Sequence, residues 1–267
     1  MPNKVIGTPT INDLAFFNAV QQQKNVTNGL KSGTMPCLPG QNGYADTAPA
    51  VNIVDGTQYQ GANLLLLKEH QRRNGFPTAE YVSEEQIGKA RLDRPTISVK
   101  QGEEGISIFF NTKDESTGGN DWENKYARLF NVAQTNNPWE LKAWANEQKQ
   151  EKIEFMQKAT ETKQKSGPEI VCSSSDPAKY LGQYFAAVTM GRPFKASPEQ
   201  AAQFAQKMET SLMQKSEKGH INPFQLSKIS NEASLYCKDY MAELKIQDRR
   251  MNLEHKMEHT QTHSRSR

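Results

Sequence analysis

Cationic, amide and aromatic side chains recur between residues 59 and 113, and their types fit contact with a nucleic-acid strand. Lysine and arginine side chains follow a phosphate backbone, and bases stack on aromatic rings without base-specific hydrogen bonds. The cations follow a leucine run at residues 64–67, lie in the next helical segment, and flank a glycine-containing turn. The candidate contact residues are Tyr59, Asn63, Lys68, Arg72, Arg73, Tyr81, Lys89, Arg91, Arg94, Lys100 and Lys113.

The alternative interpretation is that these cations are ordinary surface residues. Acidic side chains are interspersed with them and offset their charge; these are Glu69, Glu80, Glu84, Glu85 and Asp93. Phe110 is a further aromatic candidate in the same stretch.

Metal chemistry has one formal match, near the C-terminus. His255, His259 and His263 recur every four residues, and residues 255–259 fit the HxxEH pattern of inverted zincins. A catalytic zinc site needs a third ligand, a general base and a shielded cavity, whereas the surroundings here are polar. We interpret the match as fortuitous and expect neither a metal site nor catalytic residues.

Other catalytic signatures are missing from the sequence. It has no HExxH, no GxSxG, and neither GxxxxGK[ST] nor GxGxxG. The three cysteines, Cys37, Cys172 and Cys237, are far apart and form no CxxC pair, so buried thiols are expected. The sequence therefore predicts a protein that is not an enzyme and has no cofactor.

Composition favours a polar protein that stays in the cytoplasm. Only 35% of the 267 residues are hydrophobic, and the mean hydropathy is −0.80. No apolar run could span a bilayer and the N-terminus has no secretory signal, so we expect no membrane partner. Residues 245–267 hold six cations against three carboxylates, which leaves the remainder balanced despite a net charge of +3. This balance argues against an acidic DNA mimic.

Periodicity and turn residues predict the elements that would position these side chains. Helices are expected over residues 11–23, from Tyr59 to about Gly75, and from a capping box at Ser83 through Arg91. A loop-rich stretch is expected over residues 25–57. Two extended runs, 96–100 and 106–110, are joined through glycines and predict a β-hairpin, and residues 127–134 could add a third strand.

This order of motifs resembles the N-terminal domain of ArdC-type antirestriction proteins and of TraC-type plasmid primases. The first block matches the family's Asn, Thr-Gly turn and Tyr-Arg-Gly-X-Asn segment at Asn52, Gly56, Thr57, Tyr59, Gly61, Asn63 and Leu64 to Leu67. Later blocks match at Tyr81, Ser83 and Gln86, at Lys100, Gly102, Glu103 and Gly105, and at Phe130, Asn131 and Gln134. The matches cover residues 10–137, about half the chain.

The resemblance implies an α+β domain that binds single-stranded DNA. Gln60 stands where the family has arginine and Tyr81 where it has tryptophan, which removes one cation and one large stacking surface. ArdC itself also carries a metalloprotease domain with an HExxH helix, a motif that this sequence lacks.

The rest of the chain is predicted to be helical. Polar residues 139–165 predict a connecting helix. Helix start and stop residues at Asp176-Pro177, Gly191 and Ser197-Pro198 predict two more helices. A further helix is expected from Pro223 to about Lys245. We therefore expect an ArdC-like domain at 1–137 with a small antiparallel sheet packed by helices, a connector at 138–168, a helical bundle at 169–246, and a basic tail containing histidines at 247–267.

The function predicted from these patterns is sequence-independent binding of single-stranded DNA by a plasmid or mobile-element protein. It would serve conjugation, antirestriction or plasmid maintenance, with conjugation-machinery proteins as possible partners. The alternative is a protein-interaction module that recruits or inhibits a transfer component and has reduced or lost DNA binding.

Overall fold

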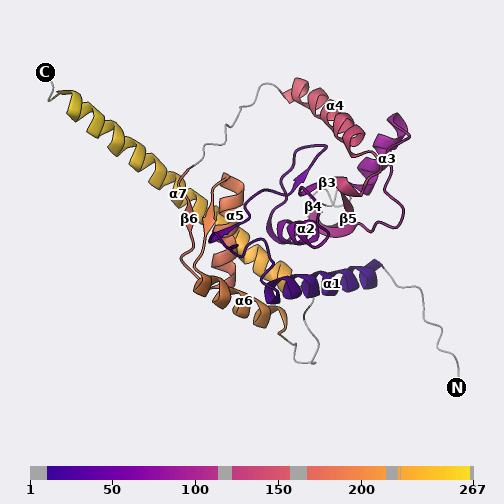
Figure 1. The fold of residues 1–267 in the computed structure, drawn as a ribbon, viewed down its shortest axis with the longest axis horizontal. Helices are drawn as coiled ribbons and strands as arrows, with labels where there is room; N and C mark the ends of the chain where they lie inside the picture. Colours follow the sequence, from indigo (N-terminus) through magenta and orange to yellow (C-terminus); the bar gives the residue numbers. More distant parts are fainter. Residues whose placement is uncertain (1–10, 114–121, 157–166, 215–221, 223, 265–267) are drawn as a thin grey trace.

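The computed structural model shows a chain of helices and mostly short strands (Figure 1). Their buried side chains form a main core and a smaller second core. The structure describes residues 11–113, 122–156, 167–214, 222 and 224–264. The predicted α+β class is confirmed. Within these residues the elements are α1 (Ile11–Lys31), β1 (Tyr44–Ala45), β2 (Val51–Asn52), α2 (Gly61–Arg73), β3 (Glu80–Ser83), α3 (Glu84–Asp93), β4 (Ile106–Lys113), β5 (Trp122–Asn131), the 3-10 turn η2 (Val132–Gln134), α4 (Pro138–Met156), β6 (Ile170–Val171), α5 (Pro177–Met190), β7 (Phe194–Lys195), α6 (Pro198–Leu212) and α7 (Gln225–Ser264).

The larger sheet has the strand order β2-β3-β5-β4. β5 pairs antiparallel with β4 over eight residues and with β3 over three, while β2 pairs parallel with β3. Alternate residues face opposite sides of a sheet. Tyr81 and Leu129 therefore join the main core with α2, whereas Val82 and Phe130 join the second core with α3 and α4.

Helix α2 is central to the main core. Leu64, Leu65, Leu66 and Leu67 are all buried, as the leucine run predicts. The helix ends in a Schellman motif, because the N–H groups of Gly75 and Phe76 donate to the carbonyls of Arg72 and Gln71 and Gly75 has a φ of 67°.

At the other end of α2 the backbone touches α7. Gly61 has a φ of 60°, and a Cβ there would lie 2.9 Å from the Ser230 Oγ. Only a glycine fits both the left-handed conformation and this close approach.

The predicted capping box of α3 is confirmed. The Ser83 side chain accepts from the Gln86 N–H, and the Gln86 side chain accepts from the Ser83 N–H. The punctuation of α5 and α6 is also confirmed, with Asp176 and Ser197 as N-caps and Gly191 in the left-handed conformation after α5.

Helices α5 and α7 form the closest helix pair of the second half. They meet at Gly182, where a Cβ would lie 2.6 Å from the Tyr236 ring and 2.8 Å from the Ala233 carbonyl oxygen. Helix α6 closes the other side, and its Phe204 stacks on Tyr180 of α5 with ring centroids 4.0 Å apart. Among the described helices, none is both long and apolar enough to cross a membrane.

The structure differs from several sequence-based predictions. Residues 96–100 form no strand; within them Val99 makes a single bridge to Thr135. The hairpin instead joins β4 to β5, because the extended run continues to Lys113. Helix α1 continues beyond residue 23 to Lys31, since Val26 and Leu30 continue its buried face.

Another difference concerns the second half, which contains strands as well as helices. β7 pairs antiparallel with β1 and parallel with β6, in a sheet of order β1-β7-β6. The main core includes residues of both halves, from Val26 to Cys237. Helix α7 continues through residue 264, where the sequence predicted a tail.

His70 on α2 is buried in the main core. Its Nδ1 lies 3.0 Å from the Tyr81 hydroxyl, which donates in turn to the Leu67 carbonyl oxygen. Burial, helped by the nearby Arg73 charge, lowers the pKa of His70 from 6.5 to about 4. The ring is therefore neutral at pH 7.

The buried neutral His70 predicts a loss of stability in mild acid. Because its pKa is lower folded than unfolded, its contribution is complete above about pH 6.5 and is lost as pH falls toward 4. We expect the free energy of unfolding to fall by about 2 kcal/mol between pH 8 and pH 5 from this residue. Urea unfolding at both pH values measures it, with His70→Gln as the non-titrating comparison. An equal pH dependence in that variant would contradict the assignment.

Candidate functional site

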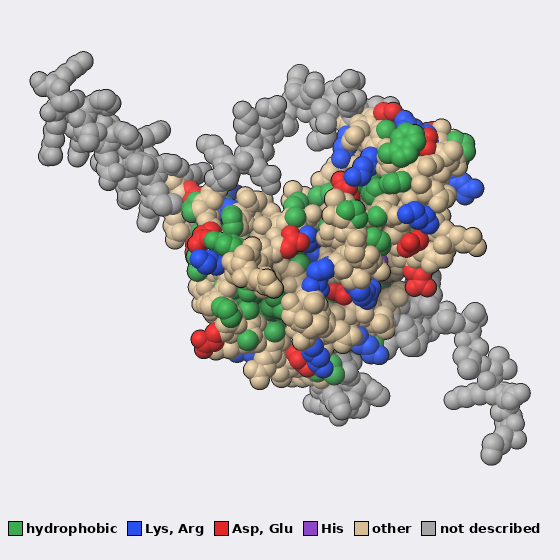
Figure 2. Space-filling model, in the orientation of Figure 1, with side chains coloured by type: hydrophobic (Ala, Val, Ile, Leu, Met, Phe, Trp, Pro, Cys, Tyr) green, Lys and Arg blue, Asp and Glu red, His purple; other side chains and the backbone are tan. Residues whose placement is uncertain are grey.

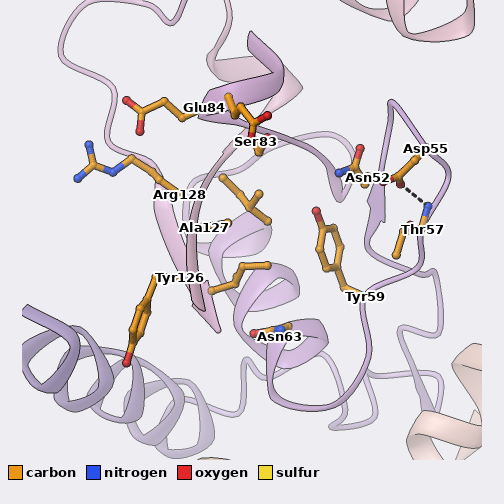
Figure 3. Close-up of a pocket in the computed structure, with 13 residues that line it drawn as sticks. Asn52, Asp55, Thr57, Tyr59, Asn63, Ser83, Glu84, Tyr126, Ala127 and Arg128 are labelled. Atoms are coloured by element: carbon orange, nitrogen blue, oxygen red, sulfur yellow. Dashed lines mark hydrogen bonds between the residues drawn. The ribbon is translucent and has the colours of Figure 1, made fainter. Parts of the chain in front are cut away.

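A groove of about 900 Å³ opens where β5 extends beyond its neighbour β3 (Figure 3). Its walls come from the loop after β2, the start of α2, the start of α3, and strands β4 and β5. The lining residues are Asn52, Asp55, Thr57, Tyr59, Asn63, Ser83, Glu84, Glu85, Ile108, Tyr126, Ala127, Arg128 and Leu129.

The groove exists because β3 is short. The pairing of β3 with β5 stops at Ser83 and Leu129, while β5 continues back to Trp122 with β4 on its other side. The chain turns into α3 at Ser83, where the capping box begins the helix. The stretch of β5 from Tyr126 to Arg128 therefore borders the groove instead of a neighbouring strand.

Two β5 side chains, Tyr126 and Arg128, border the groove and project from one face of the strand, and in Figure 3 they extend away from Tyr59 and Asn52. Tyr126 is 38% exposed and Arg128 is exposed, whereas Ala127 between them packs on the main core. Gly105 leaves room for the Arg128 side chain, because a Cβ at Gly105 would lie 2.7 Å from the Arg128 Cγ. The strand thus presents an aromatic ring and a guanidinium two residues apart.

The opposite wall is held by hydrogen bonds. The Asn52 side chain accepts from the Val54 N–H and donates to Gln86 Oε1, which ties the loop to the cap of α3. In Figure 3 the Tyr59 hydroxyl points toward Asn52. Burial raises the pKa of Tyr59 to about 12, so its hydroxyl stays neutral and can donate or accept a hydrogen bond.

Charge in the groove is mixed. Asp55 accepts from the Thr57 N–H, and Glu85 forms an exposed ion pair with Lys89 at 2.7 Å. Arg128 and Glu84 extend on the same side of the groove in Figure 3. On the molecular face shown in Figure 2, cations and carboxylates are likewise interspersed.

The structure gives two predicted contact residues buried positions. The Tyr81 ring is fully enclosed, so it has no face open to a base. Lys68 is 2% exposed and its Nζ lies 2.5 Å from Asp46 Oδ2. Both sit on the core side of their elements, so neither side chain is presented to the groove.

The other predicted residues are spread over several surfaces. Tyr59 and Asn63 line the groove. Lys89 pairs with Glu85, Arg94 with Glu147, and Arg73 lies 3.9 Å from Glu69. The Lys100 ammonium donates to the Ala133 carbonyl, while Arg72 and Arg91 are exposed. The side chains of Lys113 and Phe110 lie outside the described residues.

Sequence reasoning missed Tyr126 and Arg128. The third strand was expected to begin at Ala127, one residue too late to include the tyrosine. The signal was present as a two-residue alternation of Tyr126 and Arg128 with Ala127 and Leu129.

No group of three or more His, Cys, Asp or Glu side chains in the described part of the chain is placed to hold a metal ion. The histidines of the HxxEH match lie outside the described side chains.

Comparison with known proteins gives a family match that includes the groove. The model described as the N-terminal domain of anti-restriction factor ArdC matches residues 21–166. None of the curated proteins compared matches this chain. Of the two groups that the sequence motifs resemble, the matching model is that of ArdC.

Two crystal structures of the antirestriction protein ArdC from plasmid R388 are similar in fold. The Mn(II)-bound structure has a TM-score of 0.51 and 12% sequence identity, and the match covers 84% of this chain and 97% of that chain. The metal-free structure has a TM-score of 0.49 and 12% identity, with 82% and 95% covered.

Proposed function

This chain belongs to the family of the N-terminal domain of the anti-restriction factor ArdC, and from that premise we propose that it binds single-stranded DNA regardless of sequence. We place this binding in antirestriction or in the transfer and maintenance of a plasmid. The groove beside β5 is the contact surface, and the exposed pair of Tyr126 and Arg128 on one strand is the observation that carries the proposal.

The chemistry of that pair suits an unpaired strand. An exposed aromatic ring accepts a stacked base of any identity, and a guanidinium pairs with a phosphate in a bidentate manner. Asn52, Thr57 and Asn63 add polar side chains along the groove. The bordering stretch of β5 is open where β3 stops, which leaves room for an extended chain. A duplex would hide its base faces and so gain nothing from Tyr126.

The carboxylates of the groove limit affinity. Asp55, Glu84 and Glu85 line the same space as Arg128, so repulsion of phosphate offsets part of the attraction. We therefore expect binding that weakens steeply with salt, because the released counterions supply much of the free energy.

The test measures anisotropy of labelled oligo-dT with the full chain. Tyr126→Ala is expected to weaken binding about tenfold through lost stacking. Arg128→Gln is expected to weaken it about tenfold and to lower the slope of log K against log salt by about 0.7. The matched controls are the exposed residues Trp139 and Lys238, because Trp139→Ala and Lys238→Gln change the same residue classes away from the groove.

Two results would reject the proposal. One is a folded wild-type protein that does not bind oligo-dT at low ionic strength, or that binds duplex of equal length more tightly. The other is equal loss of affinity in the groove variants and in their controls, which would indicate nonspecific attraction.

Two observations favour a second function, which is binding to a protein instead of DNA. Lys68 and Tyr81 are buried in the core, and three carboxylates line the groove. In this alternative the domain has lost DNA binding and recruits or inhibits a protein of the transfer machinery. Size-exclusion chromatography with candidate partners distinguishes the two, because a protein complex would persist after nuclease treatment whereas a DNA-bridged one would not.

A further inference from the structure

A second cavity, of about 400 Å³, lies at the C-terminal end of α2, away from the groove. Residues of α2 form one wall, and the irregular chain from Gly33 to Asp46 forms the other. α2 has 13 residues, so its two ends are about 20 Å apart. The groove takes Asn63 from the first turn of α2, and the cavity takes Lys68, Gln71 and Arg72 from its last turns.

The buried Lys68 ammonium lines the cavity, and the carboxylate that neutralises it, Asp46, also accepts a second hydrogen bond. Lys68 is 2% exposed and contacts Asp46 Oδ2, while Asp46 Oδ1 accepts from the Ala48 N–H. Both carboxylate oxygens therefore have donors. The ammonium carries three N–H groups and uses one of them for Asp46.

Arg72 adds further donors one helical turn later. It lines the same cavity, and in the described part of the chain its guanidinium makes no hydrogen bond or ion pair. Partial burial lowers the pKa of Arg72, with Glu69, Cys37 and Asp46 opposing the shift. Gln71 donates to the Phe76 carbonyl, so its amide is held beside the cavity.

The carbonyl groups at the end of α2 are already engaged. The helix carbonyls of Gln71 and Arg72 already accept from Phe76 and Gly75 in the Schellman motif. The charged residues that line the cavity are two cations, Lys68 and Arg72, and one carboxylate, Asp46. A bound anion would balance the second cation, and a planar guanidinium beside an ammonium fits the oxygens of a phosphate.

Apolar side chains make up much of the remaining lining. Pro36, Leu38, Pro39 and Phe76 border the same space, together with Tyr44. Such a cavity, mostly apolar with a few convergent polar groups and of this volume, suits a small molecule. The ligand should therefore carry a flat apolar group as well as an anionic one.

We propose that this cavity binds a phosphate monoester of the nucleoside monophosphate class, with the phosphate between Lys68 and Arg72 and the base against Phe76 and the prolines. The nucleotide can be free or can be the 5′-phosphorylated end of a strand. The site is separate from the groove and does not depend on strand binding there.

The test uses isothermal titration of the full chain with dAMP at constant ionic strength. Arg72→Gln is expected to weaken dAMP binding about tenfold or more, because a charge-assisted contact is lost. Arg73→Gln is the matched control, since Arg73 is the next residue of α2, lies near Glu69 and is not part of the cavity lining. Its affinity for dAMP should stay within about twofold of the wild type. Arg72 serves better than Lys68 here because its side chain is exposed and the variant should fold.

Three outcomes would overturn the assignment. They are no heat of binding with dAMP up to about 10 mM, equal affinity in wild type and Arg72→Gln, and equal affinity for dAMP and inorganic phosphate. A 5′-phosphorylated oligonucleotide that gains affinity through Arg72 over its unphosphorylated form identifies the strand end as the source. Arg72-dependent binding of free dAMP without such a gain identifies the free nucleotide. A loss of dAMP affinity in Tyr126→Ala would place the nucleotide in the groove and would also overturn the assignment, whereas the groove proposal is tested with oligo-dT alone.

Discussion

Replacement of Gly182 by alanine is expected to lower the free energy of unfolding by about 3 kcal/mol. The added Cβ would meet the Tyr236 ring at 2.6 Å and the Ala233 carbonyl oxygen at 2.8 Å. The ring could rotate, but the oxygen belongs to the backbone of α7 and can move only if the helix moves. Since α5 and α7 form the closest helix pair of the second half, a small separation weakens many contacts at once.

Gly88→Ala is the matched control for this prediction. Gly88 lies on α3, and a Cβ there meets nothing within 4 Å. Alanine is the better helix former, so this variant should gain up to about 1 kcal/mol. Urea denaturation of both variants measures the difference, and a Gly182→Ala protein as stable as the wild type would show that α5 and α7 are not packed this closely.

Phe204→Ala is expected to lower the free energy of unfolding by about 4 kcal/mol, more than the Gly182 substitution. The Phe204 ring is fully buried and stacks on Tyr180, which also packs edge-on against Phe194. Its removal leaves a cavity bordered by rigid rings that cannot easily collapse. Tyr180 also donates to the Cys37 carbonyl, so the loss should loosen the chain that lines the proposed nucleotide cavity.

Phe224→Ala supplies the control for that truncation. Phe224 is 53% exposed at the start of α7, so its loss should change the free energy of unfolding by less than about 1 kcal/mol. Thermal and urea unfolding of the two variants measure the contrast. Similar losses in both would indicate that Phe204 is not part of a packed core.

The residues that begin and end helices were the part of this fold that the sequence predicted best. Ser83 and Gln86 cap α3, and Asp176 and Gly191 bound α5, because each of these residues satisfies backbone groups by a local contact. Local contacts depend on neighbours in the chain. They therefore appear in the residue order itself.

The three-stranded sheet could not be predicted from sequence, because its strands are short and their partners are distant in the chain. β1 and β7 pair over only two residues each, Tyr44 with Lys195 and Ala45 with Phe194. Two residues carry no alternation, and the partners lie in opposite halves of the chain. The error in the hairpin has a related cause, since the glycines near residue 102 allow a turn without specifying which strands flank it.

The candidate site was predicted in part. Tyr59 and Asn63 were identified by a resemblance and do line the groove, whereas Lys68 and Tyr81 matched by residue type but face the core. Burial of a lysine depends on a carboxylate such as Asp46, which lies 22 positions earlier in an irregular segment. Residue type alone cannot give that pairing.

The close approach of Gly61 to Ser230 has a consequence for how the protein is made. On the ribosome, α2 emerges long before the segment that covers its first turn has been translated. The apolar surface of α2 that α7 covers therefore stays exposed until α7 leaves the exit tunnel, so this part of the core closes well after the front half has been made.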